Sequence, residues 1–261
     1  MQKLTESQRL AYLSAMDIDV FVPRDVAAVA PLDATTPLGG SLKLSVPAPE
    51  QRHDDEAVSS APIAAETATP SVADAARRWA LLQHDVQRCT QCRLHETRTR
   101  PVFGSGSRFA RLLIIGEAPG AEEDKQGEPF VGPAGQMLTS MLSAIGLARD
   151  AVFIANVLKC RPPQNRDPRG DEMASCRGYL TAQIAEIQPE VILAVGRFSA
   201  QQLLDLDQPL GKLRGKAHTL PGDDIPVVVT YHPAYLLRTP AAKAKTWQDL
   251  KRVHALLGAQ S

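Results

Sequence analysis

The stretch Arg111-Leu-Leu-Ile-Ile-Gly116, followed directly by Glu-Ala-Pro-Gly120, decides the fold class of this chain. An unbroken apolar run that ends at a glycine is typical of a strand buried on both faces. Such strands belong to parallel sheets with helices on both sides, whose ligands bind beyond the carboxyl ends of the strands. The loop that begins at Gly116 is therefore the first candidate for a functional site.

Further apolar segments downstream repeat this pattern and alternate with helical periodicity. Strands are predicted over 152–156, 190–196 and 226–230, and helices over 74–86, 133–145, 170–187, 198–204 and 241–257. Alternating strands and helices predict an α/β fold on a mainly parallel sheet. The loops after the strands should then converge on one site.

Residues 1–74 read differently from the rest of the 261-residue chain. Residues 4–20 could form a short amphipathic helix, because Thr5 and Gln8 have capping-box spacing. From Pro23 to about Val72, seven prolines lie among many small and acidic residues, a composition that favours a disordered linker. We expect a folded domain over 75–261. The leading helix is either a docking peptide for a repair or replication protein or of no consequence, and the second reading is favoured.

The formal net charge of zero hides an asymmetry. Residues 1–75 hold 5 basic and 11 acidic side chains, so the remainder holds 29 − 5 = 24 basic and 29 − 11 = 18 acidic ones, or +6. This excess favours a polyanionic partner only slightly. The sequence has no apolar run long enough to span a bilayer and no signal peptide, which predicts a cytoplasmic protein without a membrane partner.

Four cysteines form the pattern Cys89-x2-Cys92, Cys160 and Cys176. In a reducing compartment they are poor candidates for disulfides. Their number and the paired spacing fit tetrahedral zinc or an iron–sulfur cluster, and the spacing does not decide between the two. Four unrelated buried thiols are the weaker alternative.

Two loops carry aromatic, amide and basic candidates. Phe130 lies in Glu128-Pro-Phe-Val-Gly132, where it is equally well read as a rigid stacking face or as a core residue. Asn156 ends a predicted strand, and its carboxamide can pair with a base edge or simply cap the loop. The basic residues of the following loop suit phosphates or plain solvation: Lys159, Arg161, Arg166 and Arg169.

The last loop reads Thr230-Tyr-His-Pro-Ala-Tyr-Leu-Leu-Arg238. His232 directly follows the fourth predicted strand, where an imidazole could donate to a developing oxyanion. Leu236 and Leu237 are expected to be exposed if this loop faces DNA, because apolar side chains can wedge into a base stack.

Four motifs in this order resemble the family 4 uracil-DNA glycosylases: Gly-Glu-Ala-Pro-Gly, Pro-Phe-Val-Gly-x-Ala-Gly, Asn-Val-x-Lys-Cys-Arg-Pro-Pro-x-Asn-Arg and His-Pro-x-x-Leu-Leu-Arg. The resemblance runs from about Ala75 to the C-terminus. It implies a three-layer αβα sandwich on a four-stranded parallel sheet. It also implies that Cys89, Cys92, Cys160 and Cys176 hold a [4Fe–4S] cluster. The implied activity is release of free uracil from single- or double-stranded DNA, in base excision repair and close to the nucleoid.

The same resemblance implies roles for individual residues. Phe130 would stack on the flipped uracil, Asn156 would read its pairing edge, and His232 would donate to O2 of the leaving base. Glu117 would position the attacking water. The remaining assignments are contacts to the base by Ala118, exclusion of the thymine methyl by Glu123, and contacts to DNA by Arg161, Arg166, Leu236, Leu237 and Arg238.

Ala118 departs from better-known uracil-DNA glycosylases, which carry a water-activating Asp at that place. Either Glu117 substitutes for it, or catalysis depends on His232. The segment Arg161–Arg166 contains no histidine, so turnover is expected rather than a covalent trap on DNA. Rival readings are a non-catalytic uracil-DNA binder, a zinc-stabilised hydrolase of free nucleotides, and a polymerase-associated factor that works through residues 1–74. We expect a monomer.

Overall fold

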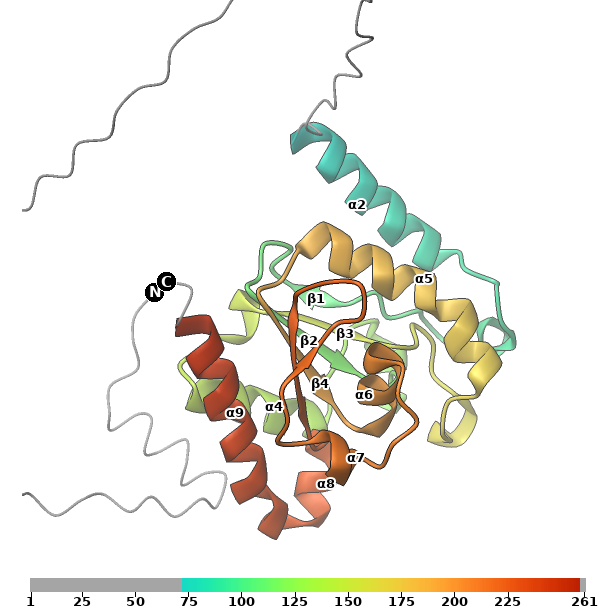
Figure 1. Cartoon of the computed structure of the whole chain (residues 1–261). Coiled ribbons are helices and arrows are strands. Elements are labelled where there is room, and N and C mark those ends of the chain that lie inside the picture. The colour runs from blue at the N-terminus through green and yellow to red at the C-terminus, as the bar shows by residue number, and fades with distance from the viewer. Residues whose placement is uncertain (1–71, 259–261) are drawn as a thin grey trace, which may run out of the picture. The chain divides into compact units, whose positions relative to one another are not determined.

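The computed structural model describes residues 72–258 (Figure 1). The helix predicted over 4–20 and the linker predicted from Pro23 lie outside the described residues. None of the helices in the described part has the length and apolar character needed to cross a membrane.

A mixed six-stranded sheet forms the centre of the described part, in the order β1-β3-β2-β4-β6-β5. Its strands are β1 (Ser105–Gly106), β2 (Leu112–Gly116), β3 (Phe153–Asn156), β4 (Val191–Val195), β5 (His218–Thr219) and β6 (Pro226–Thr230). The four inner strands are parallel, which confirms the sequence prediction. The two edge strands are antiparallel. They were not predicted, because two-residue strands have no hydrophobic period.

The helices fall into longer elements and short turns. The longer ones are α2 (Val72–Gln87), α4 (Pro133–Ala144), α5 (Gly170–Ile187), α6 (Arg197–Leu204) and α9 (Lys243–Gly258). The shorter ones are α3 (Ala121–Gln126), α7 (Leu210–Leu213), α8 (Pro233–Arg238), η1 (Arg93–Glu96), η2 (Arg149–Ala151), η3 (Pro163–Asn165) and η4 (Pro240–Ala242). All five helices predicted in this part are present, with ends that differ by a few residues.

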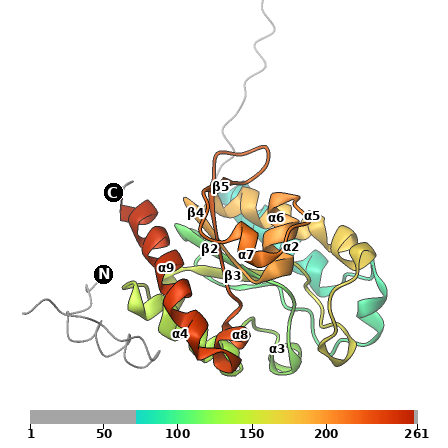
Figure 2. The same ribbon diagram turned by 60° about the horizontal axis from the view of Figure 1, so that its bottom comes forward.

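The two faces of the sheet pack against different helices, as Figure 2 shows. Alternate residues of β2 divide between them: Leu112 and Ile114 pack with α4, α8 and α9, whereas Leu113 and Ile115 face α2, α5, α6 and α7. On the second face Trp79 of α2 packs edge-on against Phe103, with ring centroids 5.0 Å apart. The three-layer arrangement therefore follows from strands that are apolar on both faces.

Candidate active site

The loops at the carboxyl ends of the inner strands converge, as the parallel order requires. Gly116 of β2 pairs in register with Asn156 of β3. The backbone N–H of Gly196, after β4, donates to the carbonyl of Thr230 at the end of β6 (3.0 Å). A Cβ atom on Gly196 would lie 3.3 Å from the Cβ of His232. The four loops thus form one site.

Gly116 lies at the centre of this site. A Cβ atom at this position would lie 2.7 Å from Cζ of Phe130. Glycine here allows the aromatic ring to lie directly against the backbone at the end of β2. The Phe130 ring also lies near His232: the two ring centroids are 5.6 Å apart, and the angle between the ring planes is 31°.

The backbone of Phe130 is held in the left-handed region, with φ of 53°. A bulky residue rarely adopts this conformation, and such strain is typical of functional sites. Two features hold the loop in place. Oε1 of Glu123 accepts hydrogen bonds from the backbone N–H groups of Val131 (3.0 Å) and Gly132 (3.2 Å). Gly135 has no room for a side chain, since a Cβ there would lie 1.7 Å from the Phe130 carbonyl oxygen.

Phe130 is a core residue whose ring also borders the candidate site. The side chain is only 6% exposed and belongs to the core cluster packed with α4. It also presents its ring at the point where Gly116, Asn156 and His232 meet. A core residue fixed in this way is a rigid face for a planar ligand.

Asn156 is 2% exposed, and its Oδ1 atom is buried without a hydrogen-bond partner. An unpaired buried carbonyl oxygen is unfavourable by roughly 1–3 kcal/mol unless a donor arrives. Such an atom in a site of converging loops indicates a ligand that brings an N–H group. The amide half of the same side chain can donate to a neighbouring carbonyl of that ligand.

His232 is the N-cap of α8, and its Nδ1 accepts a hydrogen bond from the backbone N–H of Ala234 (3.2 Å). The neutral ring therefore carries its proton on Nε2. Burial, together with the positive charge of Arg238, lowers the pKa of His232 to about 4, and the negative charge of Glu123 opposes the shift. At neutral pH the residue is an uncharged donor.

Glu117 follows β2 directly and is partly buried. Burial, together with the negative charge of Asp167, raises the pKa of Glu117 to about 7, and the positive charge of Arg197 opposes the shift. Asp167 and Arg197 form an exposed ion pair (3.1 Å). A carboxyl group whose pKa lies near neutrality at the edge of a polar pocket suits general-base chemistry.

The four cysteines lie behind the site. Cys89 and Cys92 are in the segment between α2 and η1, Cys160 follows β3, and Cys176 is in α5. All four line a single cavity together with Leu94 and Leu158. Ala118, next to Glu117, packs against the same cluster, so the cysteine cavity and the candidate site share a wall.

The donors around this cavity favour an anionic, sulfur-ligated group. Arg98 donates to Sγ of Cys160 (2.9 Å), and the backbone N–H of Lys159 donates to Sγ of Cys176 (3.3 Å). Burial raises the pKa of Cys160 to about 11, so binding of a metal there would release a proton. Within residues 72–258, no three His, Cys, Asp or Glu side chains are grouped as ligands of a single metal ion.

Lys159 corrects one expectation, because it is not an exposed phosphate ligand. It is 1% exposed, and its Nζ donates to the Asn156 carbonyl (2.9 Å) and to Oε1 of Gln183 (2.6 Å). Gln183 in turn donates to the carbonyl of Phe103 (2.8 Å). Burial lowers the pKa of Lys159 to about 8. The residue ties the backbone of Asn156 to α5.

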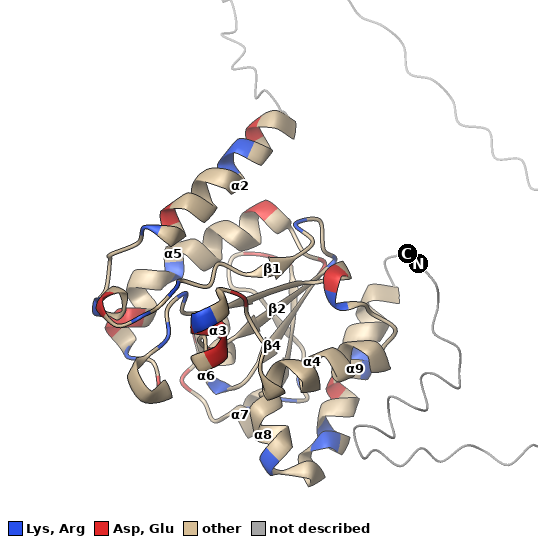
Figure 3. Cartoon of the chain, turned by 180° about the vertical axis from the view of Figure 1, so that it is seen from behind, with Lys and Arg blue, Asp and Glu red and all other residues tan. Residues whose placement is uncertain are grey.

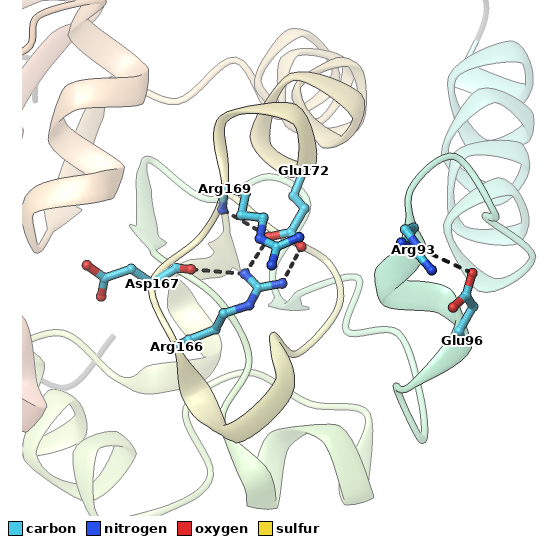
Figure 4. A network of polar contacts seen from close by, with 6 residues as sticks. All are labelled: Arg93, Glu96, Arg166, Asp167, Arg169 and Glu172. Carbon is cyan, nitrogen blue, oxygen red and sulfur yellow. Dashed lines mark hydrogen bonds and ion pairs between the residues drawn. The ribbon is translucent and has the colours of Figure 1, made fainter.

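Arg166 is also not a free cation, although it was predicted to contact DNA. Both its Nη atoms donate to Glu172, whose carboxylate also accepts from the backbone N–H of Arg169 (2.9 Å), as Figure 4 shows. The pair fixes the start of α5. Arg161 donates to Oδ1 of Asn165 (2.7 Å) and remains partly exposed.

The prediction for Leu236 is wrong, whereas the neighbouring side chain is placed as expected. Leu236 is 1% exposed in the core between α8 and α4, because α8 turns every third or fourth residue inward. Leu237 is 45% exposed, and Arg238 at the end of α8 is exposed as well.

Sequence reasoning missed three residues of this site. Gly116 was noted only as the residue that ends the first strand, yet it determines how closely Phe130 and Asn156 approach. Gln183 lies in a helix far along the chain, and no local signal links it to Lys159. Arg197 follows Gly196 at a strand end, and that position could have identified it.

Comparison with known proteins agrees with this geometry. Residues 103–251, more than half of the chain, match the family model of the uracil DNA glycosylase superfamily. The chain belongs to this superfamily. The type-4 uracil-DNA glycosylase of Archaeoglobus fulgidus is 43% identical over 180 residues, which are 67% of this chain and 90% of the relative. That of Thermotoga maritima is 44% identical over 159 residues, 60% of this chain and 82% of the relative.

The type-4 uracil-DNA glycosylase of Pyrobaculum aerophilum is 43% identical over 171 residues, 63% of this chain and 87% of the relative. This chain is thus a type-4 member of the superfamily. The matched region contains β1 to β6 and all the residues assembled around Gly116. The region that matches the superfamily therefore contains the converging loops.

Proposed function

We propose that this chain removes uracil from DNA by hydrolysing its N-glycosidic bond, which releases free uracil and leaves an abasic site. The observation that carries the proposal is the unpaired, buried Oδ1 of Asn156 beside the ring of Phe130. Uracil brings the N3–H donor that this oxygen lacks, next to the O4 acceptor for the amide half. Cytosine has no N–H at N3 and would leave Oδ1 unpaired.

The remaining residues complete a hydrolytic site. An enzyme that acts on a base in duplex DNA must first rotate it out of the helix. Phe130 then stacks on the uracil ring, and Nε2–H of His232 donates to O2. Water attacks C1′ while the bond from C1′ to N1 breaks, and its electron pair passes to the uracil ring. Glu117 accepts the proton of the water.

Neutral His232 suits this step because the negative charge at O2 appears only as the bond breaks. A donor aimed at that charge stabilises the transition state more than the ground state. Glu123 holds the loop of Phe130 in place, because its carboxylate accepts hydrogen bonds from the backbone of Val131 and Gly132. The carboxylate also lies close to Gly120. We retain exclusion of the thymine methyl as its second role.

We also propose that the four cysteines hold a [4Fe–4S] cluster. The single cavity, its apolar walls and the two N–H donors to sulfur support this. When bound, the cluster supplies a rigid cross-link between η1, the segment after β3 and α5. Iron and sulfide content, measured in wild type and in Cys92→Ala, tests the assignment, since the variant should lose both. Zinc in place of iron in the wild type would contradict it.

The DNA contacts of this site are assigned to Leu237, Arg238, Arg161 and the backbone of Ala118. Leu237 would occupy the gap left by the extruded base, which is the role that Leu236 cannot perform. We place the protein in the cytoplasm with the nucleoid, as a monomer. Residues 1–74 are assigned as an extension that takes no part in excision.

The test of the activity is incubation of the purified protein with an oligonucleotide that carries a single deoxyuridine, followed by hot alkali and a sizing gel. We expect cleavage at the uracil and none in a thymine control. Asn156→Ala should abolish cleavage. Binding of the oligonucleotide without release of uracil by wild type would support a non-catalytic binder instead. Removal of residues 1–71, which precede α2, should leave cleavage intact.

A further inference from the structure

We propose that a basic groove beside the uracil site binds the phosphate backbone of the DNA that flanks the uracil. The groove lies between helix α9 and the segment around Arg214, outside every motif that the sequence singled out. The inference rests on the proposed function only for the identity of the substrate, which is DNA that contains uracil. It adds to the uracil site a second surface that contacts this DNA.

The groove is a hollow of about 560 Å³. Its side chains come mainly from α9 and include Lys245, Gln248, Asp249, Lys251 and Arg252, with Arg214 opposite. Lys245, Gln248 and Arg252 are spaced by three and four residues and so lie along one face of the helix. Figure 3 shows basic positions along α9 and on the adjoining α8.

The groove has an excess of positive charge that the protein does not neutralise. Its one carboxylate, Asp249, is already paired with Arg214, whose Nε donates to Oδ2 (2.9 Å). Within residues 72–258, no acidic side chain forms an ion pair with Lys245, Lys251 or Arg252. Like charges held on one helix face repel each other, so an anion bound between them is favourable.

Arg214 joins the groove to the loop that carries His232. This guanidinium lies over the ring of Tyr231, the residue before His232, at 4.4 Å from its centroid. The same group donates to the backbone carbonyl of Lys245 (2.7 Å), and Tyr231 stacks on Tyr235 of α8 at 5.0 Å. A strand that leaves the site past α8 therefore meets Lys245 of α9.

The length of the groove suits a nucleic-acid backbone. Lys245 and Arg252 are seven positions apart in α9, which corresponds to about 10 Å of helix. A DNA strand advances about 3.4 Å per nucleotide, so the basic face spans roughly three nucleotides. Contacts between these cations and phosphates position the strand and carry no sequence information.

The test uses the full chain with Lys245→Gln/Lys251→Gln, two side chains that make no contact in the uracil site. Excision is measured on a short deoxyuridine oligonucleotide that fills only the pocket and on a duplex of about 30 base pairs. Fluorescence anisotropy on the same duplex without uracil gives the dissociation constant over a range of salt concentrations. The charge-matched control is Arg77→Gln/Arg177→Gln, which removes two exposed cations from α2 and α5.

We expect the variant to bind the long duplex on the order of tenfold more weakly, with a salt dependence lower by about two ions. Excision from the short oligonucleotide and the control variant should match the wild type. Unchanged binding and salt dependence on the long duplex would overturn the proposal, as would an equal loss on the short oligonucleotide. If the wild type released no uracil, the function would fail, and the anisotropy on uracil-free duplex would still decide the groove.

Discussion

No side chain fits at Gly116, because a Cβ atom there would lie 2.4 Å from Oδ1 of Asn156. The same atom would also lie 2.7 Å from the ring of Phe130. The end of β2 therefore serves as one wall of the pocket, and the two side chains proposed to hold the base lie against bare backbone. The width of the pocket depends on the absence of a single methyl group.

Gly116→Ala should lose most of its excision activity while it remains folded. The clashes are with side chains and not with backbone, so the fold tolerates the change while Asn156 and Phe130 shift from their positions. We expect at least a hundredfold fall in the single-turnover rate, since displacement of about 1 Å at a reacting site has effects of that order. The matched control is Gly178→Ala in α5, where a Cβ meets nothing within 4 Å. Wild-type rates in Gly116→Ala would show that this wall is not part of the pocket.

Phe130→Ala should weaken the hold on the flipped base. Stacking of a base on an aromatic side chain contributes about 1–3 kcal/mol, which corresponds to roughly a tenfold to hundredfold loss in kcat/KM. Phe109→Ala is the comparison, because Phe109 is 78% exposed on a turn that precedes β2, away from the carboxyl ends of the strands. Equal activity of the two variants would assign Phe130 to the core alone.

Excision should rise with pH through about 7 and then level off, because Glu117 must be ionised to accept a proton and its pKa is raised to about 7. Glu117→Gln should remove this limb and leave a low, flat profile. The stability of the fold should change in the opposite sense. Between its ordinary pKa of 4.5 and 7 the folded protein holds more protons at this residue than the unfolded chain, so stability falls as pH rises. A rate limb unchanged in Glu117→Gln would exclude this residue as the base.

His232→Ala should lower the single-turnover rate about a hundred- to a thousandfold, as removal of a donor to a developing oxyanion does. Because the pKa of His232 is lowered to about 4, no loss from its protonation is expected between pH 5 and 8 in the wild type. NMR titration of the imidazole checks this directly. In stability measurements, the neutral folded histidine predicts a loss as pH falls from about 6.5 towards 4, where only the unfolded chain binds the proton. A histidine that titrates near 6.5 in the folded protein would contradict both statements.

Lys159→Met should destabilise the domain even though the side chains have similar length. The change leaves Oε1 of Gln183 and the carbonyl of Asn156 without the donor they share, which is unfavourable by roughly 1–3 kcal/mol for each buried group. Thermal unfolding measures the effect. Lys159→Met/Gln183→Leu removes one unpaired acceptor but also the donor to the Phe103 carbonyl, so the double variant should stay about as destabilised as Lys159→Met. A Lys159→Met protein as stable as the wild type would show that these hydrogen bonds do not stabilise the fold.

The parts of the prediction that were confirmed rest on local pattern. Strands such as Leu112–Gly116 were predicted because burial on both faces gives an unbroken apolar run. The helix that begins at Pro133 was predicted from the proline at its start and Gly146 just beyond its end. The edge strands β1 and β5 were not predicted, since pairing with β3 and β6 defines them rather than their own residues. Leu236 was misplaced for a related reason, because the sequence does not show which side of a short helix meets α4.

The sequence by itself determined the chemistry that is present: the α/β order, the four thiols, and Phe130, Asn156 and His232 in segments at or after the ends of strands. Tertiary structure alone decided which groups are available for that chemistry. By sequence, Lys159 and Arg166 are cations of a basic loop. In the structure Lys159 is buried against Gln183 and Arg166 is paired with Glu172, so neither is free to bind a phosphate. Exposed cations gather on α9 instead, outside the motifs. The physical reason is that charge and burial depend on distances between segments remote in the chain, and the packing of helices on the sheet sets those distances.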